Sequence, residues 1–123
     1  MNYYGGKDLA ASFRTVRGNT LKLAADIPED KYNFRASPET KTVGQLLVHI
    51  ALSPRFARQI HGGKVTDLKT VNFGELMQTF GAEEAKPRNK AEIVSFLTTE
   101  GDAFAAYLDG LSDDFLAEKV TMM

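Results

Sequence analysis

Along three long segments the sequence places apolar residues at intervals of three and four, the spacing that keeps side chains on one face of an α-helix. We expect helices near 7–27, 42–61 and 89–110. No segment alternates apolar and polar residues as a half-buried strand does. The chain is therefore predicted to be all-α, an up-and-down helical bundle. These faces supply the residues expected in the core: Phe13, Val16, Leu46, Ile50, Phe96, Leu97, Phe104 and Leu108.

Local signals mark the ends of the first two helices. Pro28 ends the first, because the residue before a proline is pushed out of the helical region. Thr42 and Gln45 form a T-x-x-Q capping box at the start of the second. This helix is expected to stop at Gly62-Gly63, where glycine readily takes the left-handed conformation. Pro54 should kink it, because proline removes a backbone donor.

Shorter signals divide the rest of the chain. A short helix is predicted at 73–80, with Asn72 as its N-cap, and the segment 81–88 is interpreted as a loop. Asn89 caps the third long helix, and Ser112 caps a last short turn.

Composition excludes several classes of function. The 123 residues suffice for a single domain, spanning 1–123, that buries its own core. A net charge of −1 argues against nucleic-acid binding, which needs a clustered excess of Lys and Arg. No apolar run approaches the ~20 residues of a membrane helix, and without cysteine the chain has no disulfide, thiolate nucleophile or cysteine zinc site. We expect a cytoplasmic protein with no nucleic-acid or membrane partner.

His49 is the first candidate functional residue. It falls within the wide apolar arc of its helix, so we expect it to point into the bundle. It is either a core histidine bonded to a neighbour or a metal ligand, and a metal needs three or four converging ligands. Its neighbours one turn away supply no strong ligand. His61 lies about 18 Å from His49 along the helix axis and about 120° around it, so it cannot share the site. It is instead interpreted as a favourable positive charge near the helix C-terminus.

Glu100 is the second candidate, because it falls in the middle of the apolar face of the third long helix. An ionised carboxylate is costly there unless it is paired or coordinated. One interpretation is that the bundle is open at this level and Glu100 reaches water. The alternatives are that it pairs with His49 or gives a metal one carboxylate ligand.

Motifs of other enzyme classes are missing from the sequence. It contains no G-x-S-x-G, no phosphate-binding glycine loop and no H-E-x-x-H. The basic residues Arg55, Arg58 and Lys64 are interpreted as a solvated face rather than a ligand patch.

The segment 42–51, TVGQLLVHIA, followed by Arg55-Phe56 and Gly62, resembles the second helix of the DinB/YfiT-like superfamily. The segments 27–35 and 93–115 are similar to the exit of its first helix and to its third helix. This resemblance, over about residues 7 to 120, implies a four-helix bundle, usually dimeric, of a damage-inducible protein family. It also implies a divalent metal, zinc or nickel, held by three histidines. His49 matches the first ligand, and the H-x-x-x-H of the fourth helix has no counterpart here.

From the resemblance we expect a bundle whose last helix is missing or supplied by a partner chain. The implied function is a divalent-metal-dependent enzyme of the thiol-transferase or hydrolase type, acting on a small-molecule substrate that the sequence does not identify. With His49 as the one correctly placed histidine, we expect no tightly bound three-histidine metal on this chain. The alternative is a non-catalytic dimeric interaction module with an incomplete metal site.

Three helices around a four-helix core should leave one apolar groove uncovered. A second copy of the chain, in a symmetric contact, is the simplest way to cover it, so we expect a homodimer. The alternative is that the helix at 73–80 folds over the groove.

Overall fold

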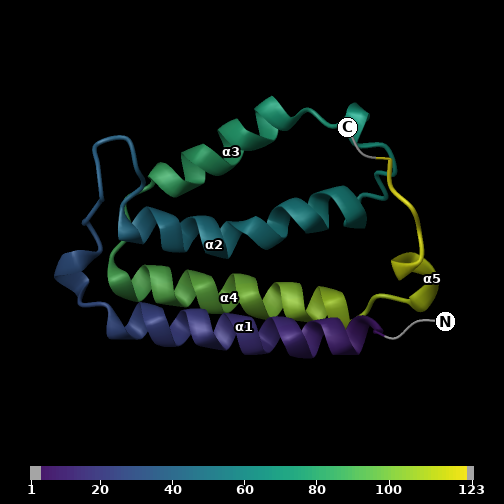
Figure 1. The fold of residues 1–123 in the computed structure, drawn as a ribbon, viewed down its shortest axis with the longest axis horizontal. Coiled ribbons are helices and arrows are strands. Elements are labelled where there is room, and N and C mark those ends of the chain that lie inside the picture. Colours follow the sequence, from purple (N-terminus) through teal and green to yellow (C-terminus); the bar gives the residue numbers. More distant parts are fainter. Residues whose placement is uncertain (1–3, 122–123) are drawn as a thin grey trace.

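The computed structural model describes residues 4–121, which contain four helices longer than two turns (Figure 1). The caps at Thr42, Asn72, Asn89 and Ser112 form where the sequence predicts them. The elements are α1 (Gly6–Asp26), α2 (Val43–Ala57), α3 (Phe73–Ala85), α4 (Lys90–Asp109) and the short α5 (Asp113–Leu116). Single turns of 3-10 helix lie at Glu29–Lys31 and Leu68–Thr70, and a π-helical turn at Arg58–Gly62 extends α2. The all-α prediction is confirmed.

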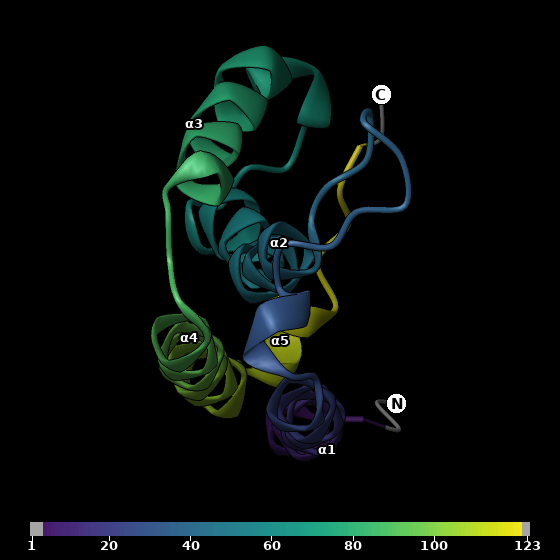
Figure 2. The same cartoon turned by 90° about the vertical axis from the view of Figure 1, so that its left-hand side faces the viewer.

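The four helices run alternately in opposite directions (Figure 1). Seen from the end, α1, α2 and α4 form a three-helix core, and α3 packs on α2 on the side away from α1 (Figure 2). The proposal that α3 folds over a groove beside α1 is therefore wrong. The buried core consists mainly of small and aliphatic residues from these helices and one tyrosine: Ala24, Tyr32, Leu47, Val48, Ala51, Leu52, Ile93 and Leu97.

Small residues set the packing of α1 on α4. Ala10 and Ala24 of α1 and Ala105 of α4 are almost completely buried. At Gly6 a Cβ atom would lie 2.3 Å from the carbonyl oxygen of Leu108, so only glycine fits this approach.

This close packing corrects part of the predicted core. Leu97 is fully buried, as expected, and five of the other predicted residues are partly buried: Phe13, Ile50, Phe96, Phe104 and Leu108. Val16 and Leu46 are wrong, with exposed fractions of 62% and 51%. The face of α1 that carries Ala10 and Ala24 packs in the core, so the face that carries Val16 is left in solvent.

A buried arginine crosses the core. Arg17 is only 6% exposed, and its guanidinium donates to the carbonyl oxygen of Leu97 in α4 at 2.7 Å. Gly101 makes room for it, because a Cβ there would lie 2.8 Å from Cγ of Arg17. Burial lowers the pKa of Arg17, whereas the negative charge of Glu100 raises it, and the guanidinium remains charged.

The end of α2 differs from the prediction. Among the described residues no glycine has a positive φ, and the residue in the left-handed region is Lys64, with φ of 57°. Gly63 is needed for a different reason, because a Cβ there would lie 2.6 Å from the carbonyl oxygen of Gln59. The π-helical turn widens the last turn and brings the backbone of Gly63 against that of Gln59.

The segment 81–88 is also corrected, because α3 continues to Ala85 rather than ending at Phe80. Open space surrounds Gly81, so it does not interrupt the helix. Beyond it, Glu84 is held by contacts with residues around the start of α2. These tertiary contacts favour the longer helix.

No helix in the part of the chain that the structure describes is long and apolar enough to cross a membrane.

Candidate functional site

His49 lies in the second turn of α2, whose start is fixed by the predicted capping box. The Thr42 hydroxyl accepts from the backbone N–H of Gln45 at 3.1 Å, and the Gln45 side chain accepts from that of Thr42 at 3.0 Å. His49 faces α3, where it contacts Glu84, rather than the centre of the three-helix core. Its side chain is 51% exposed. The expectation that His49 points into the bundle core is therefore wrong.

The partner of His49 is Glu84, in the last turn of α3. Nδ1 of His49 lies 2.5 Å from one carboxylate oxygen of Glu84, and Nζ of Lys41 lies 2.8 Å from the other. The side chain of Glu84 is only 9% exposed. Its burial would raise its pKa, but the hydrogen bonds and positive charges of Lys41 and His49 together outweigh burial and hold the pKa of Glu84 below its usual value. At neutral pH Glu84 is thus a carboxylate.

This ionised carboxylate determines how the imidazole is used. Because Glu84 can only accept, Nδ1 of His49 must carry the hydrogen and donate it. Nε2 makes no hydrogen bond to any residue that the structure describes. In the neutral ring Nε2 then holds a free electron pair. A histidine oriented by a carboxylate in this way can act as a general base or bind a metal through the other nitrogen.

The pair stands at one end of an apolar cavity of about 550 Å³ between α2 and α3. This volume lies within the range that holds a small organic ligand. Its wall surface is mostly apolar and comes from Leu52, Phe56, Met77, Phe80 and Gly81. The polar residues that line it are Lys41, His49, Ser53 and Glu84. Phe56 is fixed in the wall by stacking on Phe73, with ring centroids 5.7 Å apart. The cavity therefore combines an apolar binding surface with one oriented histidine.

Glu100, the second predicted site residue, does not join this site. Its side chain is 12% exposed and forms a two-pronged ion pair with Arg55 of α2, with Nε of Arg55 3.0 Å from one oxygen. Arg55 also lies over the ring of Phe96, as does Arg88 from the segment between α3 and α4. The interpretation that Glu100 reaches water is wrong, and so is its pairing with His49. Arg55, expected on a solvated face, is 40% exposed and also stabilises the largely buried carboxylate of Glu100.

A three-histidine metal site does not fit the described residues of this single chain. No group of three or more His, Asp or Glu side chains in residues 4–121 is placed to hold a metal ion. His61 lies in the π-helical turn at the far end of α2. His49 could thus supply one ligand, and its Glu84 contact is the kind that orients metal-binding histidines.

Sequence reasoning missed Lys41 and Glu84. A signal for Glu84 was present, because it follows Phe73 and Phe80 by eleven and four residues and so continues the same helical face. Interpreting 81–88 as a loop concealed it. For Lys41, which precedes the cap of α2, no comparable periodic signal exists.

The chain was compared with known families and proteins. The family profile described as the DinB superfamily matches residues 12–123. No curated protein and no solved structure matches the chain. The match covers α1 from residue 12 onward, the other three long helices and the cavity between α2 and α3, and it agrees with the all-α architecture. The chain belongs to the DinB superfamily.

Proposed function

We propose that this protein is an enzyme of the thiol-transferase or hydrolase type that acts on a small, largely apolar molecule bound between α2 and α3. The contact between His49 and Glu84 at the end of the cavity carries the proposal. The arrangement supplies two requirements of a general base: a histidine that lines the cavity and whose Nε2 has no partner among the described residues, and a carboxylate that orients its ring.

The residues have separate roles in this scheme. Nε2 of His49 takes the proton from a thiol or a water molecule, while Glu84 stabilises the imidazolium that forms. Lys41 holds the second oxygen of Glu84 and keeps the carboxylate in place. Phe56, Met77 and Phe80 bind the apolar part of the substrate. In a thiol transfer, the thiolate displaces a leaving group, so that one C–S bond forms as the bond to the leaving group breaks.

Two probe reactions test the proposal. The first is the conjugation of monochlorobimane with L-cysteine or glutathione, in which chloride leaves as the C–S bond forms. The second is the hydrolysis of p-nitrophenyl butyrate. We expect the purified chain to accelerate at least one of them, and His49→Asn to lower kcat/KM by about 10²- to 10⁴-fold, the contribution of a general base. Asparagine can still donate to Glu84, so this variant should keep its fold.

Two further variants separate catalysis from stability. Glu84→Gln should lower kcat/KM by about 10- to 100-fold, as expected for a group that orients a histidine. Gln78→Ala, an exposed change on the same helix, should leave it unchanged. Rates in His49→Asn that equal those of the unsubstituted chain would show that the activity does not depend on this site.

The divalent metal implied by the resemblance is a separate proposal. Because His49 is the one histidine at the site among the described residues, a bound zinc or nickel would need further ligands, and we propose a second chain as their source. Metal analysis after dialysis tests this directly. Stoichiometric metal that is lost in His49→Ala would place the metal at His49, and metal that remains in this variant would place it elsewhere.

One observation favours the alternative function, a dimeric interaction module. Apolar side chains are exposed at intervals of seven along α1, namely Leu9, Val16 and Leu23, and Leu46 is exposed on α2. We propose that a second copy of the chain covers these side chains, and the two functions are compatible in one homodimer.

A further inference from the structure

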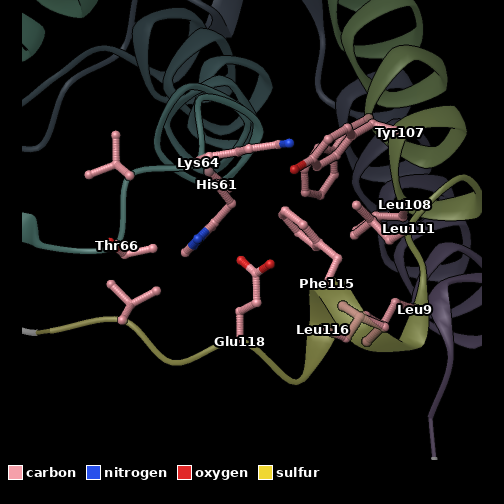
Figure 3. Close-up of a pocket in the computed structure, with 14 residues that line it drawn as sticks. Leu9, His61, Lys64, Thr66, Tyr107, Leu108, Leu111, Phe115, Leu116 and Glu118 are labelled. Carbon is pink, nitrogen blue, oxygen red and sulfur yellow. The ribbon is translucent and has the colours of Figure 1, made fainter.

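A second pocket, of about 250 Å³, lies beside the C-terminal end of α2 (Figure 3). Its walls come from α1, the end of α2, α4, α5 and the C-terminal segment. The volume is below the usual range for drug-sized ligands, so its occupant must be smaller. No residue of the His49 site contributes to it.

The C-terminal segment closes one side of this pocket. The backbone N–H of Thr121 donates to the carbonyl oxygen of Thr66 at 2.7 Å, and that of Leu68 donates to the carbonyl oxygen of Thr121 at 2.9 Å. This parallel bridge fixes the segment across the end of α2. It places Glu118 on the pocket wall, and Figure 3 shows its carboxylate and the ring of His61 pointing into the same space.

On another side stands a hydroxyl group that lacks a partner. The oxygen of Tyr107 is buried and makes no hydrogen bond to any described residue. Leaving such a group unpaired costs about 1 to 3 kcal/mol. In Figure 3 it lies at the same margin of the pocket as the amine of Lys64. Lys64 holds the left-handed backbone conformation noted above, which is uncommon for a residue other than glycine and ends the π-helical turn.

The pocket thus has three chemically different parts. Glu118 supplies a negative charge, and Lys64 with the Tyr107 hydroxyl supplies a positive charge and a free donor. The remaining wall is aliphatic and aromatic and includes Leu108, Leu111 and Phe115. In Figure 3 this apolar wall lies opposite His61 and Thr66. A ligand that matches all three parts carries an ammonium group, a carboxylate and a short apolar body.

We propose that this pocket binds an α-amino acid with an aliphatic side chain. The ammonium group binds Glu118, the carboxylate faces Lys64 and accepts from Tyr107, and the side chain fills the leucine-lined wall. A zwitterion satisfies both charges, whereas a simple acid would meet Glu118 unpaired and a simple amine would meet Lys64 unpaired. The site is independent of the reaction proposed at His49.

Isothermal titration calorimetry with three ligands tests the proposal. L-leucine is the probe, 4-methylpentanoate lacks its ammonium group, and 3-methylbutylamine lacks its carboxylate. We expect L-leucine to bind one to one and each analogue to bind at least tenfold more weakly, since charge-assisted hydrogen bonds are lost. Equal binding of L-leucine and 4-methylpentanoate, or no heat with L-leucine at millimolar concentration, would overturn the proposal.

Three variants locate the binding. Glu118→Gln should weaken L-leucine binding at least tenfold, and Tyr107→Phe should weaken it severalfold without loss of stability, because an unpaired hydroxyl is removed. Asp114→Asn makes the same charge change on α5 outside the pocket and should have no effect. Unchanged binding in Glu118→Gln would refute the assignment, and circular dichroism establishes that each variant is folded.

Discussion

Arg17 donates a hydrogen bond from Nη2 to the carbonyl oxygen of Ile50, 3.3 Å away. In an uninterrupted helix this oxygen would accept from the residue four positions on, which is Pro54 and has no N–H. The guanidinium therefore takes the place of a missing helical donor while its other nitrogen binds the carbonyl oxygen of Leu97. One buried cation thus connects α1, α2 and α4 and makes a proline tolerable inside α2.

Arg17→Met should be strongly destabilising. It removes two charge-assisted hydrogen bonds and leaves the Ile50 oxygen unpaired, which together predict a loss of about 2 to 4 kcal/mol in the free energy of unfolding. Urea unfolding at neutral pH measures it. Arg14→Met, which removes an exposed ion pair with Asp109, should cost less than about 1 kcal/mol.

Pro54→Ala should partly rescue Arg17→Met, because alanine restores the N–H that the Ile50 oxygen lacks. In a double-mutant cycle the gain from Pro54→Ala should be about 1 kcal/mol greater in the Arg17→Met background than in the unsubstituted chain. Additive effects, within about 0.3 to 0.5 kcal/mol, would mean that the two sites are not coupled through this oxygen.

Two glycines should respond to alanine with opposite signs. At Gly101 the new Cβ would lie 2.8 Å from Cγ of Arg17, near the base of a held side chain, so Gly101→Ala should destabilise by about 1 to 3 kcal/mol. Nothing lies within 4 Å of a Cβ at Gly18, so Gly18→Ala should stabilise α1 by up to about 1 kcal/mol. Thermal unfolding of both variants provides the measurement, and equal signs would contradict the packing of Arg17 on Gly101.

The fold was predictable where its signals are local. The Thr42–Gln45 box and the Asn89 and Ser112 caps depend on residues three apart and form as expected. Which face of α1 is buried was not predictable in this way. The larger residues Val16 and Leu23 mark the more hydrophobic face, but the packing of α1 on the distant α4 buries Ala10 and Ala24 instead.

For the site, sequence reasoning identified one half of each ion pair. His49 and Glu100 were singled out because each interrupts an apolar face. Their partners Glu84 and Arg55 lie 35 and 45 positions away, and no periodicity within one helix connects such residues. The partner determines whether a polar residue forms a site or only stabilises the core. His49 faces a cavity, whereas Glu100 is enclosed by Arg55.

Glu84→Gln should change how stability depends on pH. The pKa of Glu84 is lower in the folded than in the unfolded chain, where it is about 4.3. Its carboxylate therefore contributes stability that is complete above this pH and is lost as the pH falls through the folded pKa. The variant should unfold about 1 kcal/mol more easily at pH 7 and differ less from the unsubstituted chain below about pH 4. Urea titrations at pH 7, 5 and 3.5 measure both effects.

Asp102→Asn serves as the control for this change. It removes one exposed carboxylate from α4, outside the His49 site. The difference from the unsubstituted chain should stay small at all three pH values. If Glu84→Gln behaves like Asp102→Asn, the contacts with Lys41 and His49 do not stabilise the fold.

The proposed homodimer depends on the exposed face of α1. With Val16 and Leu23 more than half exposed, a charge placed there should oppose a self-contact without entering the core. We expect the chain to sediment as a dimer at micromolar concentration and Val16→Lys with Leu23→Lys to sediment as a monomer. Ala11→Lys lies on another exposed face of α1 and should remain dimeric. A dimer that survives the double substitution would place the contact elsewhere. A monomeric unsubstituted chain would refute the homodimer and would show that these apolar side chains remain exposed to water.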